Sequence, residues 1–151
     1  MKNVDLNKVT LTEITFETVR EVLRLNVGEN QKQFVASNAV SISQAYFTDL
    51  AWFRAISYED TFVGFVMCEI NTKEEEYYLW RYMIDERFQG HGFGKKALEL
   101  VIDFVKEQPG AKEFFTSCVP GEGSPSQFYE KLGFVATGEI DEGEHVYKLK
   151  L

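Results

Sequence analysis

One stretch decides the fold of this 151-residue chain: Asp85-Glu86-Arg87-Phe88-Gln89-Gly90-His91-Gly92-Phe93-Gly94-Lys95. An apolar and aromatic run over 77–84 precedes it and predicts a buried strand, whereas the apolar spacing over 92–107 predicts a helix. Glycine lets the backbone approach a ligand closely, and the first N–H groups of a helix are unpaired and carry a partial positive charge. A glycine-rich turn between strand and helix therefore predicts an anion site, most often for phosphate.

The glycine spacing excludes two common nucleotide-binding motifs. The dinucleotide pattern G-x-G-x-x-G would need glycine at the position of Lys95, and the P-loop would need glycine at the position of Gln89 and Ser or Thr at that of Lys96. The spacing that fits is Q-x-x-G-x-G, formed by Gln89, Gly92 and Gly94. The alternative is a tight strand-to-helix turn that binds no ligand.

Composition narrows the class of protein. Hydrophobic residues make up 44% of the sequence, enough for the core of one domain spanning 1–151. The net charge of −8 disfavours nucleic-acid binding and favours cationic small molecules. Cys68 and Cys118 lie in apolar runs without nearby histidine pairs, so we expect reduced core cysteines and no metal site. The polar N-terminus and the lack of an apolar run of roughly 20 residues predict no membrane partner and a cytoplasmic location.

The remaining pattern predicts an α/β domain. Thr15 is the expected N-cap of the first helix, and Ser41 with Gln44 has the spacing of a capping box for the second. Crossovers at 92–107 and 126–132 place the parallel pairing in the second half of the chain. Strands are expected over 4–11, 52–58, 61–70, 77–84, 114–119, 134–137 and 144–151, and helices over 16–25, 41–49, 92–107 and 126–132.

A second motif follows the glycine loop by about 35 residues: Ser126-Gln127-Phe128-Tyr129-Glu130-Lys131-Leu132-Gly133-Phe134. In this order, the two motifs closely resemble the pyrophosphate loop and the "FYEKLGF" box of the GCN5-related N-acetyltransferase (GNAT) superfamily. A finer resemblance, to bacterial spermidine/spermine (polyamine) acetyltransferases, rests on 83–90, 27–31 and 138–147. The resemblance implies a single-domain GNAT fold, in which a mixed, mostly antiparallel sheet of about seven strands has helices on both faces.

The resemblance also implies roles for individual residues, with acetyl-CoA as the cosubstrate. Tyr129 would protonate the departing CoA thiolate, because a phenol with a pKa of about 10 is neutral at pH 7. The backbone of Tyr82, Met83 and Ile84 would run beside the pantetheine arm, with an N–H near Ile84 polarising the thioester carbonyl. Glu122, where relatives often have Asn, is a further cofactor position. The pyrophosphate is expected at Gln89, Gly90, His91, Gly92, Phe93, Gly94 and Lys95.

The acceptor side is less defined by sequence. An amine arrives protonated, so a base or a water relay is needed. Glu69 and Asp85 are candidate bases, and a solvated surface carboxylate is the alternative for each. Glu29 and Gln31 are candidate substrate-binding residues in the segment before the second helix.

The implied reaction is direct acetyl transfer from acetyl-CoA to a primary amine in a ternary complex, with a polyamine such as spermidine or spermine as the expected acceptor. Trp80 and Arg81 stand where some polyamine enzymes carry acidic residues, which weakens the polyamine assignment. The alternatives are another acceptor (a protein N-terminus, an aminoglycoside or an amino acid) or a CoA-binding module without turnover. Because dimers are frequent in that family, the C-terminal hairpin is a candidate homodimer contact.

Overall fold

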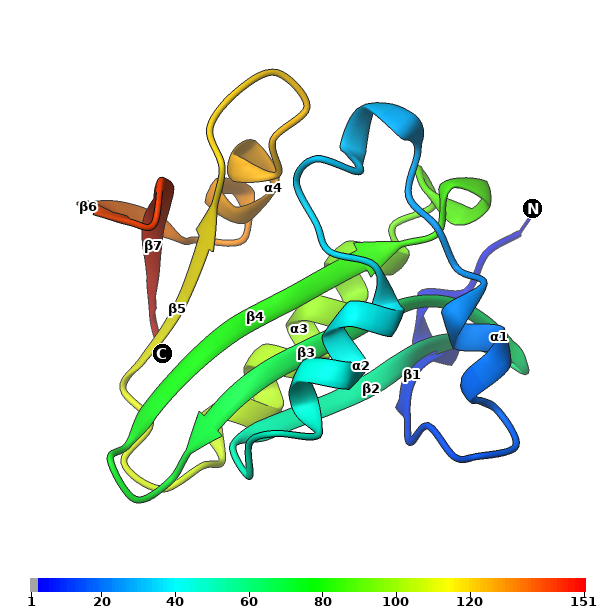
Figure 1. Ribbon diagram of the computed structural model, residues 1–151, viewed down its shortest axis with the longest axis horizontal. Coiled ribbons are helices and arrows are strands. Elements are labelled where there is room, and N and C mark those ends of the chain that lie inside the picture. The colour runs from blue at the N-terminus through cyan, green and yellow to red at the C-terminus, as the bar shows by residue number, and fades with distance from the viewer. Residues whose placement is uncertain (1–2) are drawn as a thin grey trace.

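A seven-stranded sheet organises the chain in the computed structural model, which describes residues 3–151 (Figure 1). The strands are β1 (Val9–Thr12), β2 (Ala51–Tyr58), β3 (Thr61–Asn71), β4 (Glu76–Ile84), β5 (Glu113–Cys118), β6 (Val135–Asp141) and β7 (Glu144–Lys150). The α-helices are α1 (Val19–Leu23), α2 (Asn38–Ala45), α3 (Phe93–Lys106) and α4 (Ser126–Lys131), with 3-10 turns at Leu6–Lys8, Glu29–Gln31 and Glu86–Phe88. The expected fold class is confirmed.

The order of the strands is β1-β2-β3-β4-β5-β7-β6, and all neighbours are antiparallel except β4 and β5. That parallel pair holds together only where Tyr78 lies opposite Phe115 and Leu79 opposite Thr116. Beyond these residues the two strands diverge (Figure 1). The expected position of the parallel pairing is confirmed, and its brevity leaves an edge of β4 without a strand partner in the middle of the sheet.

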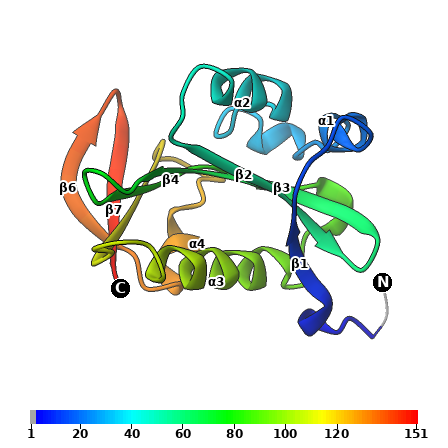
Figure 2. The same ribbon diagram turned by 90° about the horizontal axis from the view of Figure 1, so that it is seen from below.

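Both faces of the sheet are covered. Figure 2 shows α1 and α2 on one face and α3 and α4 on the other. The central strand β3 supplies both cores, since successive side chains of a strand point to opposite faces. Phe65 and Met67 pack in the cluster under α1 and α2, whereas Val66 and Cys68 pack in the cluster under α3. All four side chains have no exposed surface, which explains the continuous apolar run in this strand.

The second helix begins three residues earlier than the sequence predicts. The Ser37 hydroxyl accepts a 3.3 Å hydrogen bond from the Val40 N–H and caps α2. Ser41 is fully buried within the helix, and Gln44 lies near its C-terminal end. The predicted capping box is therefore wrong, because Ser37 offers the same hydroxyl one turn earlier.

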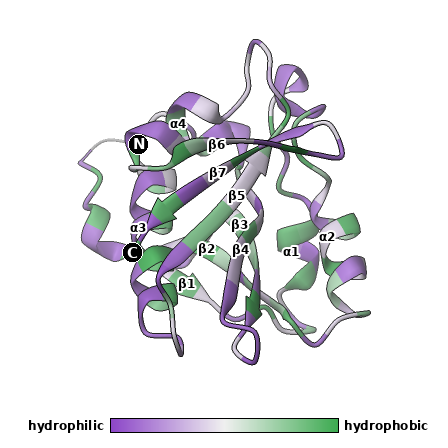
Figure 3. Cartoon of the chain, turned by 90° about the vertical axis from the view of Figure 1, so that its left-hand side faces the viewer, coloured by the Kyte–Doolittle hydropathy of each residue, from purple (hydrophilic) through white to green (hydrophobic). Residues whose placement is uncertain are grey.

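Other boundaries shift by local geometry. The first strand covers only Val9–Thr12, since a 3-10 turn at Leu6–Lys8 takes up the middle of the predicted 4–11 strand. The first helix shrinks to Val19–Leu23, and Thr18 rather than Thr15 is its N-cap residue. The β6–β7 hairpin lies on the side of the molecule that faces the viewer in Figure 3.

Candidate active site

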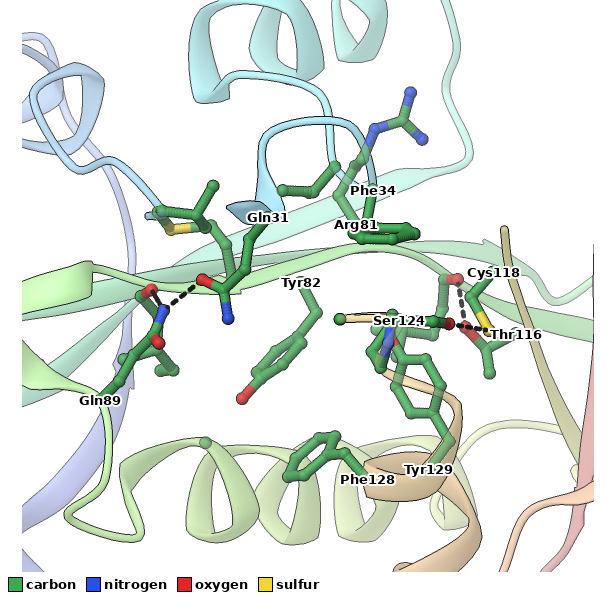
Figure 4. Close-up of a pocket in the computed structure, with 18 of the residues that line it drawn as sticks. Gln31, Phe34, Arg81, Tyr82, Gln89, Thr116, Cys118, Ser124, Phe128 and Tyr129 are labelled. Carbon is green, nitrogen blue, oxygen red and sulfur yellow. Dashed lines mark hydrogen bonds between the residues drawn. The ribbon is translucent and has the colours of Figure 1, made fainter. Parts of the chain in front are cut away.

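A cavity of about 740 Å³ lies where β4 and β5 separate. On one side of the sheet its walls are the loop before α3 and the start of α4, and on the other side they are residues 31–36, ahead of α2. Figure 4 shows both groups of side chains around β4. A cavity of this size suits a small organic molecule. Because it reaches both faces through the gap in the sheet, two ligands can approach the same point from opposite sides.

The glycine loop lies at one end of this cavity. Gly90 and Gly92 have φ angles of 82° and 85°, in the left-handed region that favours glycine. Gly92 is the N-cap of α3, and its carbonyl accepts from the Lys96 N–H at 3.1 Å. The N–H groups of the three residues between them have no partner within the helix. These amides, with the Lys95 ammonium on the same turn, make the arrangement that binds phosphate at helix N-termini.

Tyr82 packs directly on the start of α3. A methyl group added at Gly94 would fall on the phenolic oxygen of Tyr82, so glycine is required for this approach. The Tyr82 ring stacks on Phe128, with centroids 5.4 Å apart and planes inclined by 7°. Both rings lie between β4 and α3 in Figure 4. Burial raises the pKa of Tyr82, with a smaller contribution from Tyr129, so the phenol is neutral and acts as a packing group.

Gln89 fixes the loop to the rest of the site. Its side-chain nitrogen donates to the Ile84 carbonyl at 2.9 Å and to the side-chain oxygen of Gln31 at 2.8 Å. The first bond holds the loop against the end of β4. The second bond joins the loop to the 3-10 turn Glu29–Gln31, which leads into residues 31–36. One side chain therefore links the cavity walls on the two sides of the sheet (Figure 4).

Tyr129 projects from α4 into the same cavity and is 5% exposed. Burial raises the pKa of its phenol, and a hydrogen bond with the Thr116 hydroxyl lowers it by less. The phenol therefore keeps its proton throughout the neutral range. The Ser124 hydroxyl lies 3.7 Å from the Cys118 sulfur nearby, and Figure 4 shows these groups around the Tyr129 side of the cavity. The structure thus places a protonated phenol at the cavity.

A β-bulge in β4 shapes the opposite wall of the cavity. Met67 faces Arg81 and Cys68 faces Leu79, so Trp80 is an extra residue in the strand. As a result Trp80 and Arg81 both turn toward α2: the indole packs in the α1–α2 core, and the Arg81 guanidinium donates to the Gln44 side-chain oxygen at 3.1 Å. Burial lowers the pKa of Arg81, while the charge of Glu144 opposes that effect.

Four charged side chains line the cavity: Lys32, Arg81, Lys95 and Glu144. Lys95 lies at the glycine loop. The other three line the part of the cavity away from that loop, which we call the acceptor half. The Ser117 hydroxyl donates a 3.3 Å hydrogen bond to Glu144. Sequence reasoning missed Lys32, Ser117 and Glu144 as site residues. No motif marks them, because they meet the cavity through the pairing of β5 with β7 and the path of the chain before α2.

The structure brings most of the expected site residues together, but five do not line the cavity: Glu29, Glu69, Asp85, His91 and Glu122. Glu29 forms a 2.7 Å ion pair with Lys32. Glu69 lies in β3 between Ala51 and Tyr78. Those at the cavity are Gln31, Tyr82, Met83, Ile84, Gln89, Gly90, Gly92, Phe93, Gly94, Lys95 and Tyr129.

Asp85 is neither at the cavity nor a solvated surface carboxylate, the two alternatives expected from sequence. Its buried carboxylate accepts hydrogen bonds from the N–H groups of Asn26 and Arg87, both at 2.9 Å, and from the Arg87 guanidinium at 2.8 Å. Burial alone would raise the pKa of Asp85, but these hydrogen bonds outweigh it and hold the pKa below its usual value. The carboxylate joins the segment after α1 to the end of β4 and lies outside the cavity.

The structure is thus a single-domain α/β protein with a cavity of the size of a small molecule and a glycine-rich loop at the start of α3 beside it. The family model described as "Acetyltransferase (GNAT) family" matches residues 20–134. The chain therefore belongs to the GNAT family of acetyltransferases. This membership confirms the expected enzyme class, an N-acetyltransferase with acetyl-CoA as its cosubstrate.

Individual relatives agree with this assignment. The chain is 29% identical over 147 residues to the spermine/spermidine N(1)-acetyltransferase of Bacillus subtilis strain 168, covering 91% of this chain and 95% of that one. Its fold is similar to an acetyltransferase from Thermus thermophilus, with a TM-score of 0.77, 17% identity and coverage of 95% and 97%. It is also similar to the PaiA N-acetyltransferase from Thermoplasma acidophilum in complex with coenzyme A, with a TM-score of 0.71, 15% identity and coverage of 95% and 99%.

Two negative findings apply to residues 3–151. No group of three or more His, Cys, Asp or Glu side chains there could hold a metal ion. Within the same residues, no helix is both long and apolar enough to cross a membrane.

Proposed function

We propose that the protein transfers the acetyl group of acetyl-CoA directly to a small primary amine in a ternary complex. The observation that carries this proposal is the continuous cavity that runs from the amides at the start of α3 to the opposite face of the sheet. A donor bound by its diphosphate at one end and an acceptor entering at the other would meet beside Tyr129. The protein would then act chiefly by positioning the two reactants.

The donor half supports acetyl-CoA as the ligand. The loop amides and Lys95 suit a diphosphate. Beyond Leu79 the edge of β4 faces the gap without pairing to β5, so the backbone of residues 82–84 is suited to hydrogen-bond a pantetheine arm as an added strand would. An N–H near Ile84 is proposed to polarise the thioester carbonyl.

Tyr129 is proposed to act as the acid. The neutral amine attacks the thioester carbonyl, a C–N bond forms and the C–S bond breaks. The departing thiolate takes the phenolic proton of Tyr129, and the phenolate regains a proton from the nitrogen of the new amide. Because burial raises the pKa of Tyr129, the phenol is always protonated at the start of the cycle.

A polyamine is the first acceptor to test. Two relatives at 27–29% identity are named as spermine or spermine/spermidine acetyltransferases, and the chain carries a net charge of −8. A second candidate is an amine that also bears a carboxylate, such as an amino acid. The cations of Lys32 and Arg81 in the acceptor half favour it. The cytoplasmic location expected from the sequence stays a prediction.

The test is release of free thiol from acetyl-CoA with a panel of amines. Spermidine and spermine are compared with amino acids, a peptide N-terminus and an aminoglycoside. Turnover with spermidine would support the first candidate, and turnover only with an amino acid the second. Tyr129→Phe should lower kcat without changing the Kd for CoA, whereas Tyr147→Phe, a buried tyrosine outside the cavity, should leave both unchanged. Tight CoA binding without thiol release for any amine would contradict the proposal and indicate a binding module.

A further inference from the structure

Glu144 is the one carboxylate among the cavity-lining residues in the described part of the chain. We propose that Glu144 binds an ammonium group of the acceptor other than the amine that attacks, which must be neutral. This inference rests on the proposed function and specifies how the acceptor half of the cavity recognises its substrate. No proton transfer to Glu144 is part of it.

The pairing of β5 with β7 places Glu144 on the acceptor face of the sheet. Along β5, Thr116 and Cys118 are buried toward the Tyr129 side, so Ser117 between them points to the opposite face. Ser117 lies opposite Val146, and Glu144 precedes Val146 by two residues, which puts it on the same face. The Ser117 hydroxyl bonds one carboxylate oxygen at 3.3 Å. Within residues 3–151, no hydrogen bond uses the second oxygen of this carboxylate.

The carboxylate lies within electrostatic reach of the reacting end of the cavity. Its charge raises the pKa of the Tyr129 phenol and of Cys118, and it opposes the effect of burial on Arg81. The groups that respond come from β4, β5 and α4, the elements that surround the gap in the sheet. The charge of Glu144 therefore acts on groups that line the cavity from both faces of the sheet.

None of the ion pairs within residues 3–151 includes Glu144. Arg81 on β4 is close enough for the charge of Glu144 to oppose the lowering of its pKa by burial, but its guanidinium donates to the Gln44 side chain and the Trp80 carbonyl, both at 3.1 Å. A half-buried carboxylate without a direct ion-pair partner gains from a charged hydrogen bond supplied by a ligand. An alkylammonium group is the ligand that fits, and every polyamine carries more than one ammonium group.

Glu144→Gln tests the inference, because it removes the charge and keeps the shape and the bond from Ser117. We expect the KM for the amine to rise about 10- to 100-fold, the range for losing one charged hydrogen bond, with the Kd for acetyl-CoA unchanged. Glu144→Asp keeps the charge and should retain part of the affinity. The matched control is Glu139→Gln, an exposed carboxylate on the same hairpin that lies outside the cavity and should leave the KM unchanged.

An unchanged amine KM in Glu144→Gln, with the wild-type protein active, would overturn this inference and leave the proposed function intact. A wild-type protein that releases no thiol with any amine would overturn the proposed function and this inference with it. If Glu144→Gln unfolds at a lower temperature than Glu139→Gln, Glu144→Asp is used for the comparison. An amine KM that is higher in Glu144→Asp than in Glu144→Gln would also contradict the assignment.

Discussion

The side-chain nitrogen of Gln89 donates a 2.8 Å hydrogen bond to the side-chain oxygen of Gln31, 58 residues away in the sequence. Gln89 belongs to the loop before α3, and Gln31 to the turn ahead of α2. The contact therefore joins two walls of the cavity that come from segments far apart in the sequence. Both residues were expected at the site from sequence, but for different substrates, and nothing in their spacing indicates that they touch.

This contact can be measured with a double-mutant cycle of Gln31→Ala and Gln89→Ala. We expect a coupling of about 0.5–1.5 kcal/mol in the free energy of unfolding. Gln89→Ala alone should cost more than Gln31→Ala, because it also removes the bond to the Ile84 carbonyl. Urea unfolding of the four proteins gives the numbers. Strictly additive effects would show that the two side chains do not interact in solution.

Gly92 should be required for CoA binding, in addition to its contribution to the stability of the fold. Gly92 and Gly138 have the same φ of 85°, so alanine at either position should cost about 1–2 kcal/mol of unfolding free energy through backbone strain. Only Gly92 lies at the start of α3, where an added methyl would also press on Leu6 at 3.2 Å. Calorimetric titration should show weaker CoA binding by Gly92→Ala and unchanged binding by Gly138→Ala. Equal affinities in the two variants would remove the loop from the donor site.

The close approach of Gly94 and Tyr82 predicts a rescue. Gly94→Ala gains about 1 kcal/mol in helix propensity, but the methyl collides with a phenol fixed by its stack on Phe128. Overpacking of this kind costs about 1–3 kcal/mol. We expect Gly94→Ala to lower the melting temperature, and to lower it less when Tyr82→Phe removes the phenolic oxygen. The same melting point for Gly94→Ala and wild type would contradict the packing described above.

Asp85 should make stability depend on pH. Its pKa is lower in the folded protein than in the unfolded chain, where it is about 3.9. Its contribution is therefore fully present above about pH 5 and is lost as the pH falls through the folded pKa. Asp85→Asn should cost about 1–3 kcal/mol at pH 7, and the gap to wild type should narrow between pH 5 and pH 3 in urea unfolding. The control is Asp103→Asn, on the exposed face of α3, which should unfold with the same free energy as wild type. If the difference between Asp85→Asn and wild type did not change with pH, the Asp85 carboxylate would not be ionised in the folded protein.

The place of the glycine loop at the cavity could be predicted from sequence because its spacing is local. Gln89, Gly92 and Gly94 lie within six residues, beside one helix start. Tyr129 could be placed at the cavity because its motif surrounds it with core residues in a fixed order. These features depend on short-range backbone geometry, which a linear pattern records well.

The acceptor half depends on pairings that no short pattern contains. Glu144 reaches the cavity only through the register of β5 with β7. Arg81 turns toward α2 because Trp80 is an extra residue in the strand, and neither residue type indicates a bulge. Glu69 has a suitable side chain in a suitable strand, yet it lies outside the cavity. Ser37 and Ser41 are equally good caps by type, and tertiary packing decides between them.

The interrupted outer strand has a consequence for self-association. β6 ends the sheet, and its register with β7 breaks between Ala136 and Ile140, where Gly138 has a φ of 85°. Each regular piece is therefore too short to template a strand from another molecule. Val135 and Ile140 are 65% and 66% exposed on this hairpin. A dimer built there would use side chains rather than strand pairing, since the irregular rim disfavours strand addition at the β6 edge.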